Sequence, residues 1–184
     1  MIEVRFHGRG GQGSVTAARI LADAFVLEGK YGSSFPMFGF ERRGAPVTAF
    51  LRFDDHPIKE KTQIYTPDCL VVLDSFLKDS AFIYEGLKPG GVLILNGAKP
   101  VKRRPDANVQ RLGLIDAGAV ASEEMGIPSP NTCLIGAFAA ATGWIDLESV
   151  LASLGHYFKG DILEKNIRSA QRGFREVKVI QWPG

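Results

Sequence analysis

The chain has 184 residues, of which 45% are hydrophobic and 23% charged, an ordinary composition for one globular domain spanning residues 1–184. Its 22 basic and 20 acidic side chains leave a net charge of +2, which argues against the clearly basic surface of a nucleic-acid-binding protein. The longest apolar run, residues 133–141, is too short for a membrane span of about 20 residues. Residues 1–6 are already strand-like and leave no room for a signal peptide, so we expect a cytoplasmic protein.

The cysteines and histidines do not suggest a metal or redox centre. Cys69 and Cys133 lie far apart within apolar segments, and no Cys-x-x-Cys pair is present. We therefore expect two buried, reduced thiols and no iron–sulfur cluster held on thiolates of this chain alone. His7, His56 and His156 are scattered, and no His, Asp or Glu cluster has metal-ligand spacing. We predict no metal site and no catalytic nucleophile–base pair.

The first elements are a strand, a glycine-rich loop and a helix. Ile2, Val4 and Phe6 alternate with polar residues, and Gly8-Arg9-Gly10-Gly11-Gln12-Gly13 follows them. Apolar residues then recur at helical spacing over residues 14–28, and Gly29 ends that helix. This arrangement resembles the opening of a Rossmann fold.

The next segments have mainly strand character. We predict strands over residues 31–35 and 47–53, and a turn at Asp54-Asp55-His56-Pro57 that forms a hairpin with a further short strand. The continuous apolar runs within residues 68–74 and 92–95 are typical of strands buried on both faces of a parallel sheet. Between them we predict a helix that ends near Leu87, before the Pro89-Gly90-Gly91 breakers.

The remaining chain is mostly helical. Residues 99–104, with four basic side chains, suit a solvated connection, and residues 109–115 suit an edge strand. Asp116 is placed to cap a helix through Met125, and Asn131 or Thr132 to cap a small-residue helix to Thr142. Two amphipathic helices end the chain, and Asp161 with Glu164 resembles a capping box at the second. Strands alternating with helices predict an α/β fold, a three-layer α/β/α arrangement whose sheet is mostly parallel but mixed.

The glycine loop is the first candidate site. Gly8-x-Gly10-x-x-Gly13 fits the dinucleotide fingerprint, and amides at a helix start attract anions, so Gly10, Gly11, Gln12 and Gly13 are candidate phosphate contacts. An acidic residue for the ribose is missing, because Glu28 has the spacing but falls at the end of the helix. NAD or FAD binding is therefore disfavoured. A phosphate or partner contact and a tight turn without ligand both remain open.

The second candidate site is the segment Phe35-Pro36-Met37-Phe38-Gly39-Phe40-Glu41-Arg42-Arg43-Gly44-Ala45-Pro46, whose composition suits a loop. Arg42 and Arg43 have guanidinium groups that suit a phosphate group, carboxylates across a subunit interface, or Glu41. The aromatic residues and Met37 are of the kind that is buried against a partner. The alternative is that this loop folds back onto its own core.

Together, these two motifs resemble the gamma subunit of 2-oxoacid:ferredoxin oxidoreductases. The resemblance continues through Arg52-Phe53-Asp54-Asp55-His56-Pro57-Ile58 and reappears over residues 126–136, so it covers nearly the whole chain. Glu41-Arg42-Arg43-Gly44-Ala45-Pro46 looks more like the pyruvate and branched-chain oxoacid enzymes than the 2-oxoglutarate ones. We therefore expect pyruvate as substrate, with 2-oxoisovalerate as the alternative.

The resemblance implies a division of labour between chains. Alpha and beta subunits would carry thiamine diphosphate and Mg²⁺, a ferredoxin-like delta subunit would carry [4Fe-4S] clusters, and ferredoxin would accept the electrons. Coenzyme A would collect the acyl group. The gamma chain would contact the other subunits and help to shape the coenzyme A site, with no catalysis of its own. A stand-alone nucleotide- or coenzyme A-binding module is the remaining hypothesis.

Overall fold

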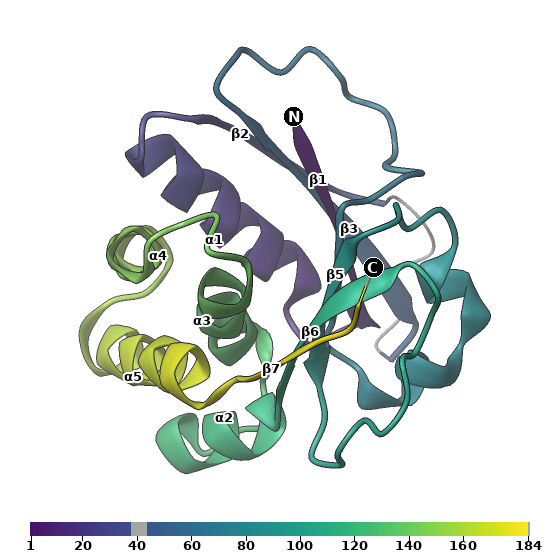
Figure 1. Ribbon diagram of the computed structural model, residues 1–184. Helices are drawn as coiled ribbons and strands as arrows, with labels where there is room; N and C mark the ends of the chain where they lie inside the picture. The colour runs from purple at the N-terminus through teal and green to yellow at the C-terminus, as the bar shows by residue number, and fades with distance from the viewer. Residues whose placement is uncertain (38–43, 184) are drawn as a thin grey trace.

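A computed structural model describes residues 1–37 and 44–183 of the chain (Figure 1). The strands in chain order are β1 (Ile2–Arg9), β2 (Tyr31–Pro36), β3 (Pro46–Asp54), β4 (Cys69–Val72), β5 (Gly91–Asn96), β6 (Val109–Ile115) and β7 (Lys178–Gln181). The α-helices are α1 (Ser14–Leu27), α2 (Ala117–Met125), α3 (Asn131–Thr142), α4 (Leu147–Tyr157) and α5 (Gly160–Glu176). Two short 3₁₀ helices, η1 (Ser75–Asp79) and η2 (Ala81–Tyr84), lie between β4 and β5.

The strands form one mixed sheet in the order β2-β3-β1-β4-β5-β6-β7. Its centre, β1, β4, β5 and β6, is parallel, whereas β3 pairs antiparallel with β1 and β2, and β7 pairs antiparallel with β6. The predicted α/β class with a mixed sheet and a parallel core is confirmed. Within the described residues no helix is long and apolar enough to cross a membrane.

The two faces of the sheet are covered differently. The α-helices gather on one face (Figure 1), and the side chains of Cys69 and Val71 pack into their cluster. Leu70 and Val72, which alternate with them along β4, belong to a second cluster with residues of η1 and η2. Because both faces of β4 are buried, its continuous apolar run was a sound predictor of a central strand.

The small-residue helix α3 packs at backbone distance against α5. A Cβ atom at Gly136 would lie 1.9 Å from the Ala170 carbonyl oxygen, and one at Gly173 would lie 1.9 Å from the Cys133 carbonyl oxygen. Only glycine fits at either position without moving a helix, which explains the composition of this pair.

Several predicted elements are wrong in detail. The segment before Leu87 forms η1 and η2 instead of one α-helix, because the Asp74 carboxylate accepts the Phe76 N–H at 3.0 Å and Ser80 is extended. Strand β3 pairs antiparallel with β1 and β2 instead of with a strand after Pro57, and the residues between Pro57 and β4 form no strand. Strand β6 is not an edge, because β7 pairs with it from outside.

The predicted helix caps have mixed outcomes. The Asp116 side chain accepts the Ala119 N–H at 3.0 Å and caps α2 as expected. Helix α3 begins at Asn131, but Pro130 is its cap residue and no side chain caps it. Asp161 forms an ion pair with Lys165 at 2.7 Å, and α5 begins without a capping box.

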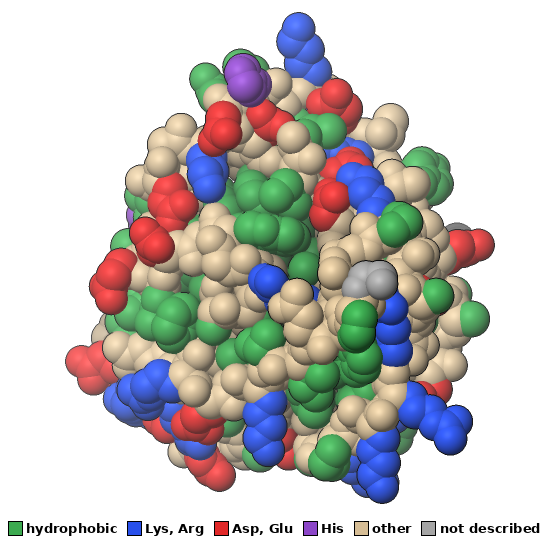
Figure 2. Space-filling model, viewed as in Figure 1, with side chains coloured by type: hydrophobic (Ala, Val, Ile, Leu, Met, Phe, Trp, Pro, Cys, Tyr) green, Lys and Arg blue, Asp and Glu red, His purple; other side chains and the backbone are tan. Residues whose placement is uncertain are grey.

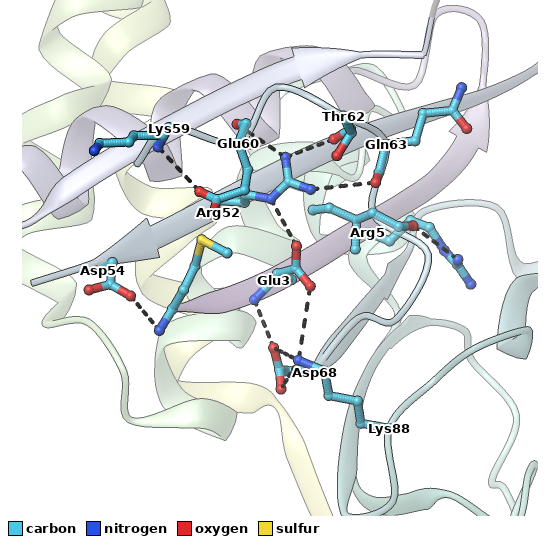
Figure 3. A network of polar contacts seen from close by, with 12 residues as sticks. Glu3, Arg5, Arg52, Asp54, Lys59, Glu60, Thr62, Gln63, Asp68 and Lys88 are labelled. Carbon is cyan, nitrogen blue, oxygen red and sulfur yellow. Dashed lines mark hydrogen bonds and ion pairs between the residues drawn. The ribbon is translucent and has the colours of Figure 1, made fainter. Parts of the chain in front are cut away.

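Two buried arginines hold the irregular segment 57–67 against the sheet (Figure 3). Arg52 donates from Nε to Glu3 at 2.8 Å and from Nη1 to the Thr62 carbonyl at 2.7 Å. Arg5 donates from Nη1 to the Ile64 carbonyl of this segment at 3.4 Å. From Nη2 it also donates to the carbonyls of Ile83 and Glu85, at the end of η2, at 2.8 and 2.7 Å. Buried carbonyl groups of a segment without secondary structure need such donors, because no neighbouring strand supplies them.

We predict that Arg52→Met lowers the free energy of unfolding by about 3–5 kcal/mol, since it leaves Glu3 and the loop carbonyls without their buried donor. Urea unfolding followed by circular dichroism measures the loss. Lys61→Met, at an exposed position of the same segment, serves as the control and should change stability by less than about 0.5 kcal/mol. Equal effects of the two changes would contradict the assigned role of Arg52.

A second prediction concerns pH. Burial, together with the Arg5 guanidinium, lowers the pKa of His7 from 6.5 to about 3, and Arg5 Nε donates to His7 Nε2 at 3.0 Å. Below pH 6.5 His7 becomes protonated in the unfolded chain but stays neutral in the folded chain. The free energy of unfolding therefore falls as the pH drops from 6.5 towards 3. His7→Gln keeps an acceptor for Arg5 and should flatten this slope by up to about 1.4 kcal/mol per pH unit. Urea unfolding between about pH 5 and 7 tests it, and an unchanged slope would contradict the prediction.

Candidate functional site

The candidate site lies at the carboxyl ends of β1 and β4, the place where the strand order of an open α/β sheet predicts a crevice. The chain leaves β1 through the glycine loop into α1 and β2, on one side, whereas β4 and the strands after it lie on the other (Figure 1). Open α/β sheets bind ligands where the strand order changes direction in this way. The glycine loop therefore lies where the fold favours a ligand.

Two hydrogen bonds between Gln12 and the Arg9 backbone close the glycine loop. Gln12 Oε1 accepts the Arg9 N–H at 2.7 Å, and the Gln12 N–H donates to the Arg9 carbonyl at 3.0 Å. Gly11 and Gly13 have φ angles of +95° and +81°, which favour glycine at both positions. These bonds fix the turn that aims the start of α1 into the crevice.

The N-terminus of α1 differs from that of α2. Asn96 Oδ1 accepts hydrogen bonds from the Ala117 and Gly118 amides at 3.0 and 3.3 Å. The start of α2 therefore has a side-chain acceptor in addition to its cap residue. Helix α1 has Gly13 as its cap residue and no side-chain cap. Its first amides, which carry the positive end of the helix dipole, are the available anion donors of this crevice.

Asn131, at the start of α3, lies against this turn. A Cβ atom at Gly13 would lie 2.5 Å from Asn131 Nδ2, so the absence of a side chain at Gly13 lets the two helix starts meet. Asn131 is 7% exposed, and its Oδ1 accepts the Ser129 hydroxyl at 3.1 Å. Within the described ranges its Nδ2 has no hydrogen-bond acceptor, and the buried Ser14 hydroxyl has no partner either. These donors suit a phosphate or carboxylate group.

The two motifs that the sequence singled out are neighbours in space. The Gly10 N–H donates to the Ala45 carbonyl at 2.9 Å, and Arg9 Nη1 to the Gly44 carbonyl at 3.5 Å. Arg9 also forms an ion pair through Nε with the buried Asp74 carboxylate at the end of β4. Arg42 and Arg43 lie outside the described residues.

Sequence reasoning missed Asp74 and the role of Asn131. Asp74 directly follows an apolar strand, and a polar residue at the carboxyl end of a parallel strand is a recognisable signal for this crevice. Asn131 was interpreted as a helix cap, and nothing in the sequence indicates its contact with Gly13. No group of three or more His, Cys, Asp or Glu residues is placed to hold a metal in the part of the chain that the structure describes.

Comparison with known proteins identifies the family. Residues 3–176 match the pyruvate ferredoxin/flavodoxin oxidoreductase family, and this chain belongs to it. The pyruvate/ketoisovalerate oxidoreductases common subunit gamma of Thermococcus kodakarensis is 50% identical over 98% of this chain and 100% of that protein. The NADH-dependent phenylglyoxylate dehydrogenase subunit gamma of Aromatoleum evansii is 48% identical over 97% of this chain and 95% of that protein.

A solved structure shares the fold. Pyruvate oxidoreductase subunit PORC of Thermotoga maritima superposes with a TM-score of 0.86 and 35% identity, covering 97% of each chain. The family match over residues 3–176 includes the glycine loop, so the resemblance drawn from the two motifs is confirmed over nearly the whole chain.

The contact between Gly13 and Asn131 yields a prediction. Gly13→Ala forces an alanine into a left-handed conformation and against Asn131 Nδ2, whereas Gly11→Ala meets no atom within 4 Å and carries only the backbone strain. We expect Gly11→Ala to lower the unfolding free energy by about 1–2 kcal/mol and Gly13→Ala by about 1 kcal/mol more. Adding Asn131→Ala removes Nδ2 and Cγ but keeps Cβ, 3.0 Å from the new methyl group, so it should reduce that difference in a double-mutant cycle measured by urea unfolding. Equal losses in the two single variants would contradict the close approach.

Proposed function

We propose that the chain is the gamma subunit of a multi-subunit pyruvate:ferredoxin oxidoreductase, or pyruvate synthase. That enzyme converts pyruvate, coenzyme A and oxidised ferredoxin to acetyl-coenzyme A, CO₂ and reduced ferredoxin. The observation that carries the proposal is the full-length likeness, at 50% identity, to a protein named as a gamma subunit. The match covers the whole of that relative, so it concerns the complete subunit rather than a shared module.

In this proposal the reaction centres belong to other chains. Thiamine diphosphate, Mg²⁺ and [4Fe-4S] clusters would lie on the alpha, beta and ferredoxin-like delta subunits of a cytoplasmic complex. The gamma chain contributes structure and interfaces, and its crevice receives an anionic group of coenzyme A. The start of α1, which has no side-chain cap, supports this role, as does Asn131 Nδ2, which has no acceptor among the residues that the structure describes. Both can donate hydrogen bonds to phosphate oxygens.

The proposal also concerns which 2-oxoacid the assembled enzyme oxidises. The Thermococcus kodakarensis relative is named as common to pyruvate and ketoisovalerate oxidoreductases, which favours a gamma chain that does not itself select the substrate. A branched-chain enzyme using 2-oxoisovalerate is therefore the alternative, and the name of the Aromatoleum evansii relative makes phenylglyoxylate worth assaying. The alternative of a stand-alone nucleotide- or coenzyme A-binding module predicts saturable binding without partners.

The assembly is tested by anaerobic affinity purification of the tagged chain from its native host. We expect iron–sulfur subunits to co-purify with coenzyme A-dependent reduction of a viologen dye by pyruvate. Parallel assays with 2-oxoisovalerate, 2-oxoglutarate and phenylglyoxylate rank the substrates. If the chain elutes alone and no oxoacid is oxidised, the subunit proposal fails, and titration of the isolated chain with coenzyme A tests the module.

The crevice is tested separately in the assembled enzyme. Asn131→Asp replaces a donor with a carboxylate of the same size, so we expect the KM for coenzyme A to rise about tenfold with the KM for pyruvate unchanged. Gln171→Glu, on α5, introduces the same charge away from the crevice as a control. A KM for coenzyme A equal to that of the parent enzyme would remove coenzyme A from this crevice and leave the subunit assignment intact.

A further inference from the structure

The sheet face opposite the α-helices presents aromatic side chains to solvent. Phe76 of η1 is 82% exposed and Phe82 of η2 is 49% exposed. The Phe76 backbone is held in place, since its N–H donates to the buried Asp74 carboxylate at 3.0 Å. The Phe82 ring packs edge-on against the buried His7 ring, with 5.9 Å between centroids. Aromatic groups on a fixed backbone are the usual anchors of protein interfaces, because little side-chain freedom is lost on binding.

The same layer carries a basic hollow. Its volume is about 390 Å³, and the cations that line it are Lys78, Lys102, Arg103 and Arg104. Residues 97–105 contain four basic side chains and no acidic one. Asp79 is the one carboxylate among the described lining residues, and it pairs with Lys78 at 3.4 Å. The hollow therefore has a strong excess of positive charge.

Hydrogen bonds and apolar packing hold the basic segment, residues 97–105, against the rest of the chain. Arg104 donates from Nε to the Val109 carbonyl at 2.5 Å and from Nη1 to the Pro183 carbonyl at 3.2 Å. Val101 packs against the apolar cluster beneath. Lys102 and Arg103 are exposed beside this anchor, and neither has a carboxylate partner within the described ranges. The anchored neighbours Val101 and Arg104 fix the backbone of Lys102 and Arg103, and the two charged side chains remain accessible to a partner.

We propose that this aromatic–basic face, formed by Phe76, Phe82, Lys78, Lys102 and Arg103, docks an acidic surface of another subunit of the complex. The inference rests on the proposed function. Charge complementarity selects the occupant, since opposite potentials attract partners and fix their orientation. A second copy of this chain would place the same basic face against itself in a twofold dimer, which like charges oppose. The exposed Phe76 and Phe82 beside these cations favour a protein surface over a small phosphate ligand, which would leave both aromatic rings in solvent.

The test uses the assembled oxidoreductase. The double variant Lys102→Glu/Arg103→Glu and the single variant Phe76→Ser are each produced with the partner subunits, and native mass spectrometry measures gamma-chain retention over a salt series. We expect the charge reversal to weaken retention at least about tenfold and to reduce its salt dependence. Phe76→Ser should weaken retention with the salt dependence kept. Lys159→Glu/Arg175→Glu, exposed on the helix side, makes the same charge change and should behave like the parent chain.

Each outcome decides the proposal. If both variants are retained like the parent chain, with the same salt dependence, the proposal is overturned. Isothermal titration of the chain with inorganic phosphate then shows whether the hollow binds phosphate, and neither result restores the proposal. Size-exclusion chromatography of the isolated chain adds a second measurement, and a dimer that the charge reversal disrupts would overturn the proposal in favour of self-association. If the parent chain itself fails to co-purify with other oxidoreductase subunits, the proposed function has failed, a result distinct from any effect of these variants.

Discussion

The donation of guanidinium N–H groups to buried carbonyls is the interaction on which the rest of the structure depends. Helices cover one face of the sheet and satisfy their own backbone, whereas 3₁₀ turns and irregular chain cover much of the other. Irregular chain brings carbonyls without partners, and each unsatisfied one would cost about 1–3 kcal/mol. Arg5 and Arg52 meet this need with five N–H donors each in a planar guanidinium group, which a lysine could not do.

This arrangement leaves the carboxyl edge of the sheet free for a site. The loop after β3 is bound to the face near Glu3, at the amino end of β1, and the glycine loop opens at the opposite end of that strand. Because Gly13 has no side chain, the Asn131 side chain at the start of α3 can lie against the start of α1. Two helix starts side by side concentrate unpaired amides at one place, so the anion-binding character arises from packing more than from charged side chains.

The sequence predicted the elements whose pattern is local. The apolar runs of β4 and β5 and the glycine loop before α1 carry their own signals, because burial on both faces and positive φ angles restrict the residue types directly. Strand β7 has only four residues and forms because β6 offers a free edge, which no local pattern shows. The contact of Asn131 with Gly13 likewise joins segments far apart in sequence, so only the folded chain displays it.

Asp74 connects the crevice with the aromatic–basic face. One carboxylate oxygen pairs with Arg9 of the glycine loop, and the other accepts the Phe76 N–H at the start of η1. The carboxylate is buried, so neither bond can be exchanged for water without a large desolvation penalty. One buried carboxylate therefore fixes both Arg9 of the glycine loop and the backbone that presents Phe76, so the two surfaces share a structural anchor.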